Sequence, residues 1–201
     1  MKATLPALLV AIALSGCALL GKSEPRVPRY FTPEYDGDAA ASPARSGLEL
    51  RLGRVEAGPH LRERMAARSS ARELYSREDR RWAERPEVYL RRALARTLFE
   101  ERGVVEALAA GAVTLDVELV AFEEVEQPHR ARMRARVSLR DTRIGLLEET
   151  IAVEQPVAND VGADPAVAVV DAFSQALHAG VTLIADRVIA KLAGEARPAA
   201  Q

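Results

Sequence analysis

Hydrophobic and polar residues alternate along two neighbouring segments of the chain, between Val113 and Asp141. Alternation with a period of two is typical of β-strands that bury one face. A loop at Gln127–His129 would let both apolar sets face one core, because a slip by one residue turns a strand over. The pattern therefore predicts an antiparallel hairpin. Its opposed pairs would be Glu126 with Arg130, Glu124 with Arg132, Phe122 with Arg134 and Asp116 with Arg140.

Glu123 falls on the apolar face of this hairpin, which indicates a β-bulge or a strand end nearby. Other even registers remain open, and each of them pairs acidic residues with arginines on the outer face. Those arginines could bind lipid phosphates, or they could form cross-strand ion pairs worth a few tenths of a kcal/mol each. Ion pairing is the favoured interpretation. The arginines concerned are Arg130, Arg132, Arg134, Arg136 and Arg140.

Shorter runs predict further strands around this hairpin. Alternation at Leu48–Leu52 ends at Gly58-Pro59, and Arg29–Thr32 ends at Pro33. Weaker alternation over Met65–Tyr75 predicts two short strands of a second hairpin. The segment Leu146–Val153 continues the sheet as a third strand of the meander.

Two segments show the 3.6-residue period of amphipathic helices. The first begins at Pro86 and runs to about Arg102, since proline is favoured in the first turn and Gly103 ends the helix. Phe99 lies off its apolar stripe. The second helix begins after Asp164 and runs to about Leu192. Its apolar stripe comprises Val170, Phe173, Leu177, Val181, Ile184 and Val188.

These elements predict a single α+β domain over residues 29–193, followed by a disordered tail at 194–201. The sheet is expected to be mainly antiparallel, with the two long amphipathic helices packed on one face, because each helix needs one apolar surface. A two-faced helix of about 28 residues is about 42 Å long and is expected to lie on the sheet instead of crossing a bilayer.

The N-terminus has the layout of a secretory signal, in which Lys2 precedes an apolar run that leads to Leu14-Ser15-Gly16-Cys17. That tetrapeptide resembles the lipobox of bacterial lipoproteins. The resemblance implies that residues 1–16 are removed, that Cys17 is lipidated, and that residues 17–28 form a tether. At about 3.5 Å per residue the tether keeps Tyr30 within about 45 Å of the lipid. The alternatives are an uncleaved anchor helix or a soluble secreted protein with a stray cysteine.

The net charge of the chain and its lack of catalytic motifs narrow the classes of function that it could have. The formal net charge is −1, so an exported chain of this kind is not expected to bind nucleic acid. Its three histidines, among them His178, show no metal-ligand spacing, and the sequence contains neither a nucleophile elbow nor a glycine-rich phosphate loop. We therefore expect no enzyme activity, cofactor or metal. Arg81 and Trp82 are candidate partner contacts, although a lone tryptophan before a helix is more often a packing residue.

Several segments together resemble the ABC-type transport auxiliary lipoproteins, the PqiC-type family. They occur in the expected order and span most of the mature chain. The segments are Arg29-Tyr30-Phe31-Thr32, Arg81-Trp82-Ala83-Glu84, Leu115-Asp116-Val117-Glu118-Leu119 with Phe122-Glu123, and Ala172-Phe173-Ser174-Gln175-Ala176-Leu177. The resemblance implies an accessory role beside an ABC transporter and a mammalian-cell-entry (MCE) type lipid-transport protein, with no catalytic residues. The insertion around Asp38 to Arg45 departs from the family pattern.

Two functions remain open at this stage. One is an accessory lipoprotein that docks an MCE-type assembly, and the other is a stand-alone lipid-binding or envelope-assembly lipoprotein. Ala18 follows the cysteine where many inner-membrane lipoproteins carry Asp, so resemblance to that sorting pattern implies the outer membrane, facing the periplasm. A homo-oligomer is compatible with either function.

Overall fold

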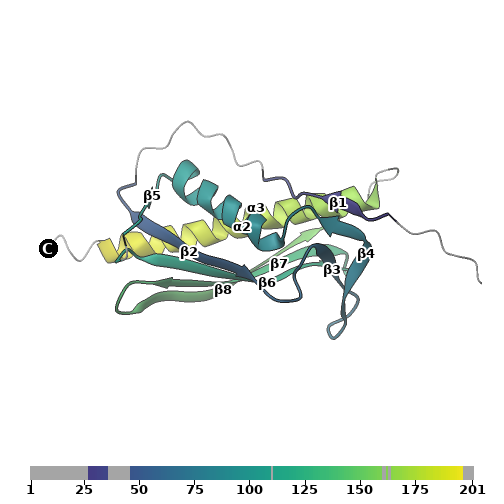
Figure 1. Ribbon diagram of the computed structural model, residues 1–201, viewed down its shortest axis with the longest axis horizontal. Helices are drawn as coiled ribbons and strands as arrows, with labels where there is room; N and C mark the ends of the chain where they lie inside the picture. Colours follow the sequence, from purple (N-terminus) through teal and green to yellow (C-terminus); the bar gives the residue numbers. More distant parts are fainter. Residues whose placement is uncertain (1–26, 36–45, 110, 160–161, 163, 197–201) are drawn as a thin grey trace, which may run out of the picture.

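A single twisted sheet carries both helices on one of its faces (Figure 1). The structure is a computed structural model and describes residues 27–35, 46–109, 111–159, 162 and 164–196. The predicted signal peptide, Cys17, nearly all of the tether and the insertion at 38–45 lie outside these residues. The single α+β domain is confirmed.

Strand β6, Thr114–Val125, is the centre of the sheet. One of its edges pairs with β7, Arg130–Arg140, which in turn pairs with β8, Gly145–Pro156; both pairings are antiparallel. The predicted meander is therefore confirmed. The other edge of β6 pairs with β2, Glu49–Ala57, and further along with β3, Arg64–Arg68.

These two pairings of β6 are parallel, and the sheet is mixed. Strand β4, Leu74–Trp82, pairs antiparallel with β3 and so confirms the second predicted hairpin. The short strands β1, Arg29–Phe31, and β5, Val105–Glu106, add parallel edges to β4 and β2. The longest ladders are antiparallel, as predicted, whereas the parallel pairings were not predicted.

The hairpin register differs from the predicted one along its whole length. Beside the turn Val125 pairs with Arg130 and Phe122 with Met133, whereas farther along the hairpin Leu119 pairs with Ala135. The register shifts between Leu119 and Ala121, so β6 carries an irregularity close to Glu123, as the conflict at that residue indicated. The predicted pairs at the turn are wrong because the turn comprises four residues, 126–129, in place of the predicted three. Farther along the hairpin an even register is confirmed, but Asp116 pairs with Ser138 and not with Arg140.

The first helix comprises α2, Pro86–Ala95, and a π-helical segment η2, Arg96–Glu101. The N–H of Arg102 donates to the carbonyl of Thr97 at 2.9 Å, a spacing of five residues, and Gly103 follows with a φ of 65°. The predicted end is confirmed. The wider turn changes which side chains face the core, and Phe99 packs partly against it.

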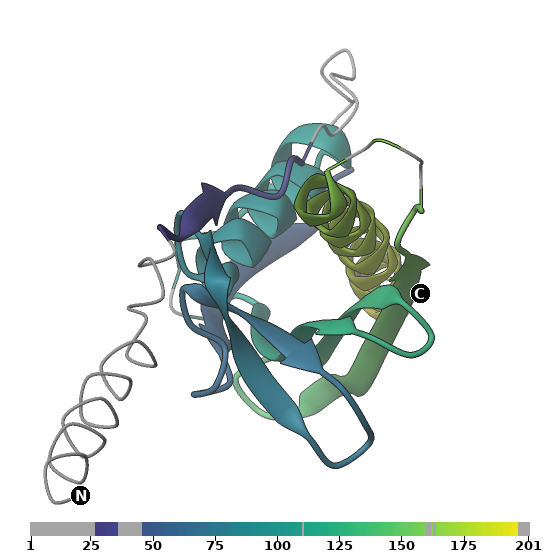
Figure 2. The ribbon, with the colours of Figure 1, turned by 90° about the vertical axis from the view of Figure 1, so that its right-hand side faces the viewer.

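Helix α3, Pro165–Ala196, lies along the sheet and crosses β7 and β8 (Figures 1 and 2). By length and composition alone it could span a membrane, since its most apolar 18-residue stretch has a mean hydropathy of 1.5. Half of that stretch, however, is buried within the fold. Every residue of the predicted stripe is buried. The helix continues beyond Leu192, which corrects the start of the predicted disordered tail.

Aromatic side chains join the two layers. The ring of Trp82 lies 5.3 Å from that of Phe122 on β6 and 5.0 Å from that of Phe173 on α3. Phe122 and Phe173 are 4.6 Å apart, and Tyr89 of α2 lies 6.2 Å from Trp82. Because Trp82 is only 1% exposed, its role is to anchor β4 against the helices.

Candidate functional site

Two successive carboxylates are buried at the turn end of β6. Glu123 is 1% exposed and Glu124 is 4% exposed. Successive side chains of a strand point to opposite faces, so the two carboxylates face opposite sides of the sheet. Phe122 packs against α3, which places Glu124 on the helix-covered side and Glu123 on the open side. A buried carboxylate needs compensating positive charge, and each of them has it.

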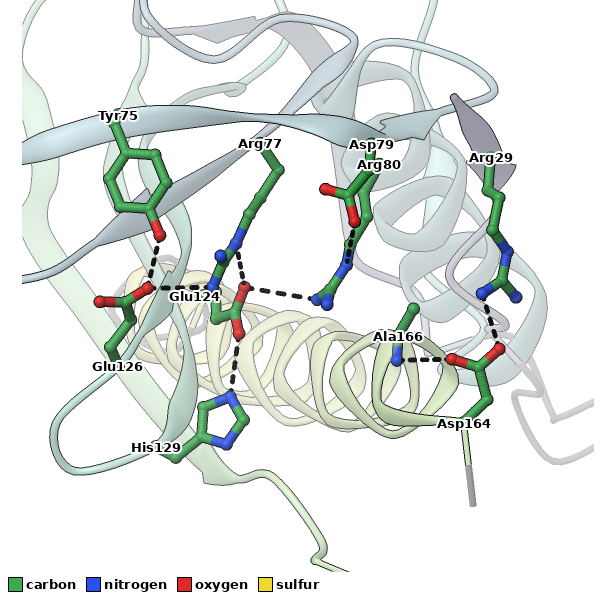
Figure 3. A network of polar contacts seen from close by, with 10 residues as sticks. All are labelled: Arg29, Tyr75, Arg77, Asp79, Arg80, Glu124, Glu126, His129, Asp164 and Ala166. Carbon is green, nitrogen blue, oxygen red and sulfur yellow. Dashed lines mark hydrogen bonds and ion pairs between the residues drawn. The ribbon is translucent and has the colours of Figure 1, made fainter. Parts of the chain in front are cut away.

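The cluster on the helix side is centred on Glu124 (Figure 3). Its carboxylate accepts a hydrogen bond of 3.0 Å from Arg77 Nε and lies 3.6 Å from Arg80 Nη1. His129 Nε2 of the β6–β7 turn lies 2.9 Å from its other oxygen. The cluster therefore joins β4, β6 and the turn.

Glu126 extends this cluster. It accepts hydrogen bonds from Arg77 Nη2, at 3.0 Å, and from the hydroxyl of Tyr75. Burial, and then the hydrogen bond to the Glu126 carboxylate, raise the pKa of Tyr75 to about 12. Burial alone lowers the pKa of Arg77, but the hydrogen bond and charge of Glu124 outweigh it and the pKa is raised. Arg77 therefore stays charged.

The open side carries a second cluster. Arg68 donates to both oxygens of Glu123, at 2.7 and 3.0 Å, and the hydrogen bond to Glu123 raises the pKa of Arg68. Arg132 also donates to Glu123, at 3.2 Å, and to Glu154 of β8 at 2.7 Å. A bidentate Arg–carboxylate pair is among the stronger polar contacts in proteins. This cluster joins β3, β6, β7 and β8.

Both clusters hold the β3–β4 hairpin against the β6–β7 hairpin. General acid–base catalysis would need a carboxyl group that is free to exchange a proton with a substrate. Both buried carboxylates instead accept hydrogen bonds from arginines. The arrangement is therefore that of a structural clamp.

The predicted arginine stripe on β7 is paired largely as the ion-pair interpretation required. Arg136 donates to Glu118 at 2.7 Å, and Arg140 lies 2.6 Å from Asp116. Arg132 and Arg130 both reach Glu154. All four of these arginines pair with acidic residues of the same sheet, so lipid phosphate is not needed to explain their presence.

A different group of arginines lines an open cleft beside the β3–β4 hairpin. The cleft has a volume of about 660 Å³, and its lining includes Ala66, Leu74 and Ser76. Among the described residues that line it are four arginines and one acidic residue, Glu63. The arginines are Arg62, Arg64, Arg81 and Arg85. Arg85 pairs with Glu87 at 2.9 Å.

The two predicted partner contacts, Arg81 and Trp82, lie in different environments. Arg81 is half-buried and lines the cleft, and its assignment as a partner contact stays a prediction. Trp82 is buried, which corrects its assignment as a partner contact and confirms the packing alternative. The exposed His178 lies 5.5 Å from the ring of Tyr35, and no metal-binding group is present among the residues that the structure describes.

Sequence comparison places this domain among envelope transport proteins. A family model described as ABC-type transport auxiliary lipoprotein component matches residues 34–185. The chain belongs to this family, and the resemblance noted from its motifs is confirmed. The family consists of lipoproteins and so implies a membrane-anchored protein of the cell envelope with an auxiliary role in transport.

Two solved structures share the fold. A crystal structure described as an uncharacterized protein superposes with a TM-score of 0.63 at 16% identity, covering 81% of this chain and 99% of that chain. A Xanthomonas campestris protein of the DUF330 family superposes with a TM-score of 0.68 at 18% identity, covering 84% and 99%. At these identities the likeness shows the fold alone. No curated protein matches the sequence significantly.

Proposed function

We propose that this protein is a non-enzymatic accessory lipoprotein of an ABC/MCE-type envelope lipid-transport system. It is anchored through a lipid on Cys17 and holds the transport assembly at the outer membrane, facing the periplasm. The observation that carries the proposal is the family match over nearly the whole folded domain. The clamped carboxylates support a non-enzymatic role, because arginines occupy the groups that catalysis would use.

The shape of the domain supports a tethering role. The described chain enters at β1, at one end of the long axis, and the β7–β8 turn lies at the other end (Figure 1). Helix α3, with 32 residues, is about 48 Å long at about 1.5 Å per residue. An anchor on the β1 side would therefore present the far end to a partner away from the membrane. Leu108, 90% exposed, and Ile144, 61% exposed, lie at that far end.

Lipidation is tested first. Metabolic labelling with a fatty-acid analogue should mark the wild-type protein and leave the Cys17→Ser variant unlabelled. Density separation of inner and outer membranes, followed by immunoblotting, should place the labelled protein in the outer membrane. Equal labelling of both chains would contradict the anchor.

The partner is tested by purification from native membranes. The lipidated protein should recover MCE-type and ABC-transporter components, identified by mass spectrometry. A Leu108→Ser/Ile144→Ser variant should recover less of them, whereas Val88→Ser, on a helix surface away from that end, should behave like wild type. If only stoichiometric lipid co-purifies, the stand-alone lipid-binding function is favoured instead.

A further inference from the structure

Two arginines face each other in the cleft beside the β3–β4 hairpin. Arg64 of β3 and Arg81 of β4 are direct partners in the antiparallel register, next to an irregularity that separates them from the rest of the ladder. Side chains at such positions are about 5 Å apart at Cβ, and like charges there destabilise a sheet. Arg29 and Arg80 are also direct partners, in the β1–β4 register, but each has an acidic neighbour: Arg29 lies 2.6 Å from Asp164, and Arg80 lies 3.6 Å from Glu124. The Arg64–Arg81 pair is thus an electrostatic cost that the fold itself does not offset.

The hydrogen-bonding state of these arginines favours an anionic ligand. The Nε atom of Arg81 is buried and has no hydrogen-bond partner in the described part of the chain. Arg62 donates only to the carbonyl of Pro59, at 3.0 Å, and neither Arg62 nor Arg64 forms an ion pair with a described carboxylate. A buried donor without an acceptor costs stability unless a ligand supplies one. Guanidinium groups are suited to phosphate because they donate from a planar fork.

We propose that this cleft binds the phosphate group of an anionic lipid headgroup, with Arg64 and Arg81 as the principal ligands and Arg62 at its rim. A volume of about 660 Å³ accommodates a headgroup, since ligand sites of about 300–1,000 Å³ are usual. The phosphate relieves the repulsion between Arg64 and Arg81 and provides the acceptor that Arg81 lacks.

The position of β1 argues for a phosphate at the membrane surface. Tyr30 pairs with Arg81 in the β1–β4 register, so the strand that follows the tether borders the cleft arginine. Tyr30 is 61% exposed and Val27 is 84% exposed. Aromatic and apolar residues beside basic ones are typical of surfaces at headgroup level. The short tether from Cys17 keeps this end close to the bilayer.

Headgroup binding rests on lipidation for its location but is independent of any MCE-type partner. It can therefore be tested with the purified protein alone. The native lipidated chain in an uncharged maltoside detergent is titrated by calorimetry with dihexanoyl phosphatidylglycerol, dihexanoyl phosphatidylcholine and glycerol phosphate. Phosphatidylglycerol should bind at least about tenfold more tightly than the other two compounds. Equal binding of glycerol phosphate would overturn the lipid assignment, and tighter binding of an oligoglutamate peptide would overturn the phosphate assignment.

Paired variants locate the site. Arg64→Ala/Arg81→Ala should weaken phosphatidylglycerol binding about tenfold or more. Arg51→Ala/Arg143→Ala removes the same charge at the opposite end of the sheet and should bind like wild type. Equal loss in both variants would show a non-specific charge effect and overturn the site.

A single substitution separates ligand binding from structural damage. Arg64→Gln removes the like-charge pair, so the unliganded protein should gain about 1–3 °C in melting temperature while its phosphatidylglycerol affinity falls. A lower melting temperature together with unchanged affinity would show that Arg64 serves the fold, and it would overturn the proposal.

Discussion

The clamp around Glu124 predicts a large and specific loss of stability when its charge is removed. In Glu124→Gln the amide has nearly the same shape as the carboxylate, but Arg77, Arg80 and His129 lose their common anion. Removing one partner of a buried ion pair typically costs about 3–5 kcal/mol. The side chains of Arg77 and Arg80 are 25% and 16% exposed, so water reaches them and reduces the penalty. We expect a loss of about 2–3 kcal/mol.

The matched control lies on the same strand. Glu118 pairs with Arg136 at 2.7 Å, but the two side chains are 47% and 55% exposed. Solvent screens such a pair, so Glu118→Gln should cost less than about 0.5 kcal/mol.

Urea unfolding at neutral pH, followed by circular dichroism, measures both variants. At about 2–4 °C per kcal/mol for a domain of this size, Glu124→Gln should also lower the melting temperature by about 4–12 °C. Equal losses in the two variants would refute the reasoning that burial makes the Glu124 cluster a clamp. An intact fold with strand β4 detached, seen as fast amide exchange in β4 alone, would support it.

Two further outcomes follow from the helices. Val181→Asp places an unpaired charge at a position that is 0% exposed, so it should destabilise the fold by about 4 kcal/mol or more and abolish the cooperative urea transition. The control Leu183→Asp lies at a position that is 43% exposed and should be tolerated. At the start of α3, hydrogen bonding from the backbone N–H of Ala166, and then the Arg29 partner, lower the pKa of Asp164 from 3.8. A carboxyl group with a lowered pKa stabilises the folded state at a pH above its ordinary pKa, and this stabilisation is lost as the pH falls through the pKa of the folded state. In Asp164→Asn that part of the acid unfolding, followed by circular dichroism, should be absent.

The elements that were predicted correctly are those whose burial pattern is local. The stripe from Val170 to Val188 repeats along one helix, and the alternation from Val113 to Leu139 repeats along two adjacent strands. Such periods report one buried face whatever lies against it. The irregularity near Glu123 was also visible, because an acid on an apolar face conflicts with the alternation.

The features that were missed depend on residues far apart in the chain. Glu123 and Glu124 find Arg68 and Arg77 at separations of 55 and 47 residues. The parallel pairing of β6 with β2 and β3 likewise leaves no trace in either strand alone. Trp82 was ambiguous because an aromatic residue at a strand end suits both a core and an interface, and only the ring contacts decide between them.

Because one edge of β6 pairs with both β2 and β3, the order of synthesis affects how the protein folds. Strands β2 and β3 both precede β6 and both depend on the same edge of it. While the chain is made from its N-terminus, the edges of β2 and β3 that pair with β6 therefore stay unpaired until Val125 has been added. Strands β7 and β8, in contrast, follow their partner strands after short turns. Exposed strand edges of this kind promote aggregation, so we expect an incomplete chain that ends before β6 to aggregate more readily than the full-length chain.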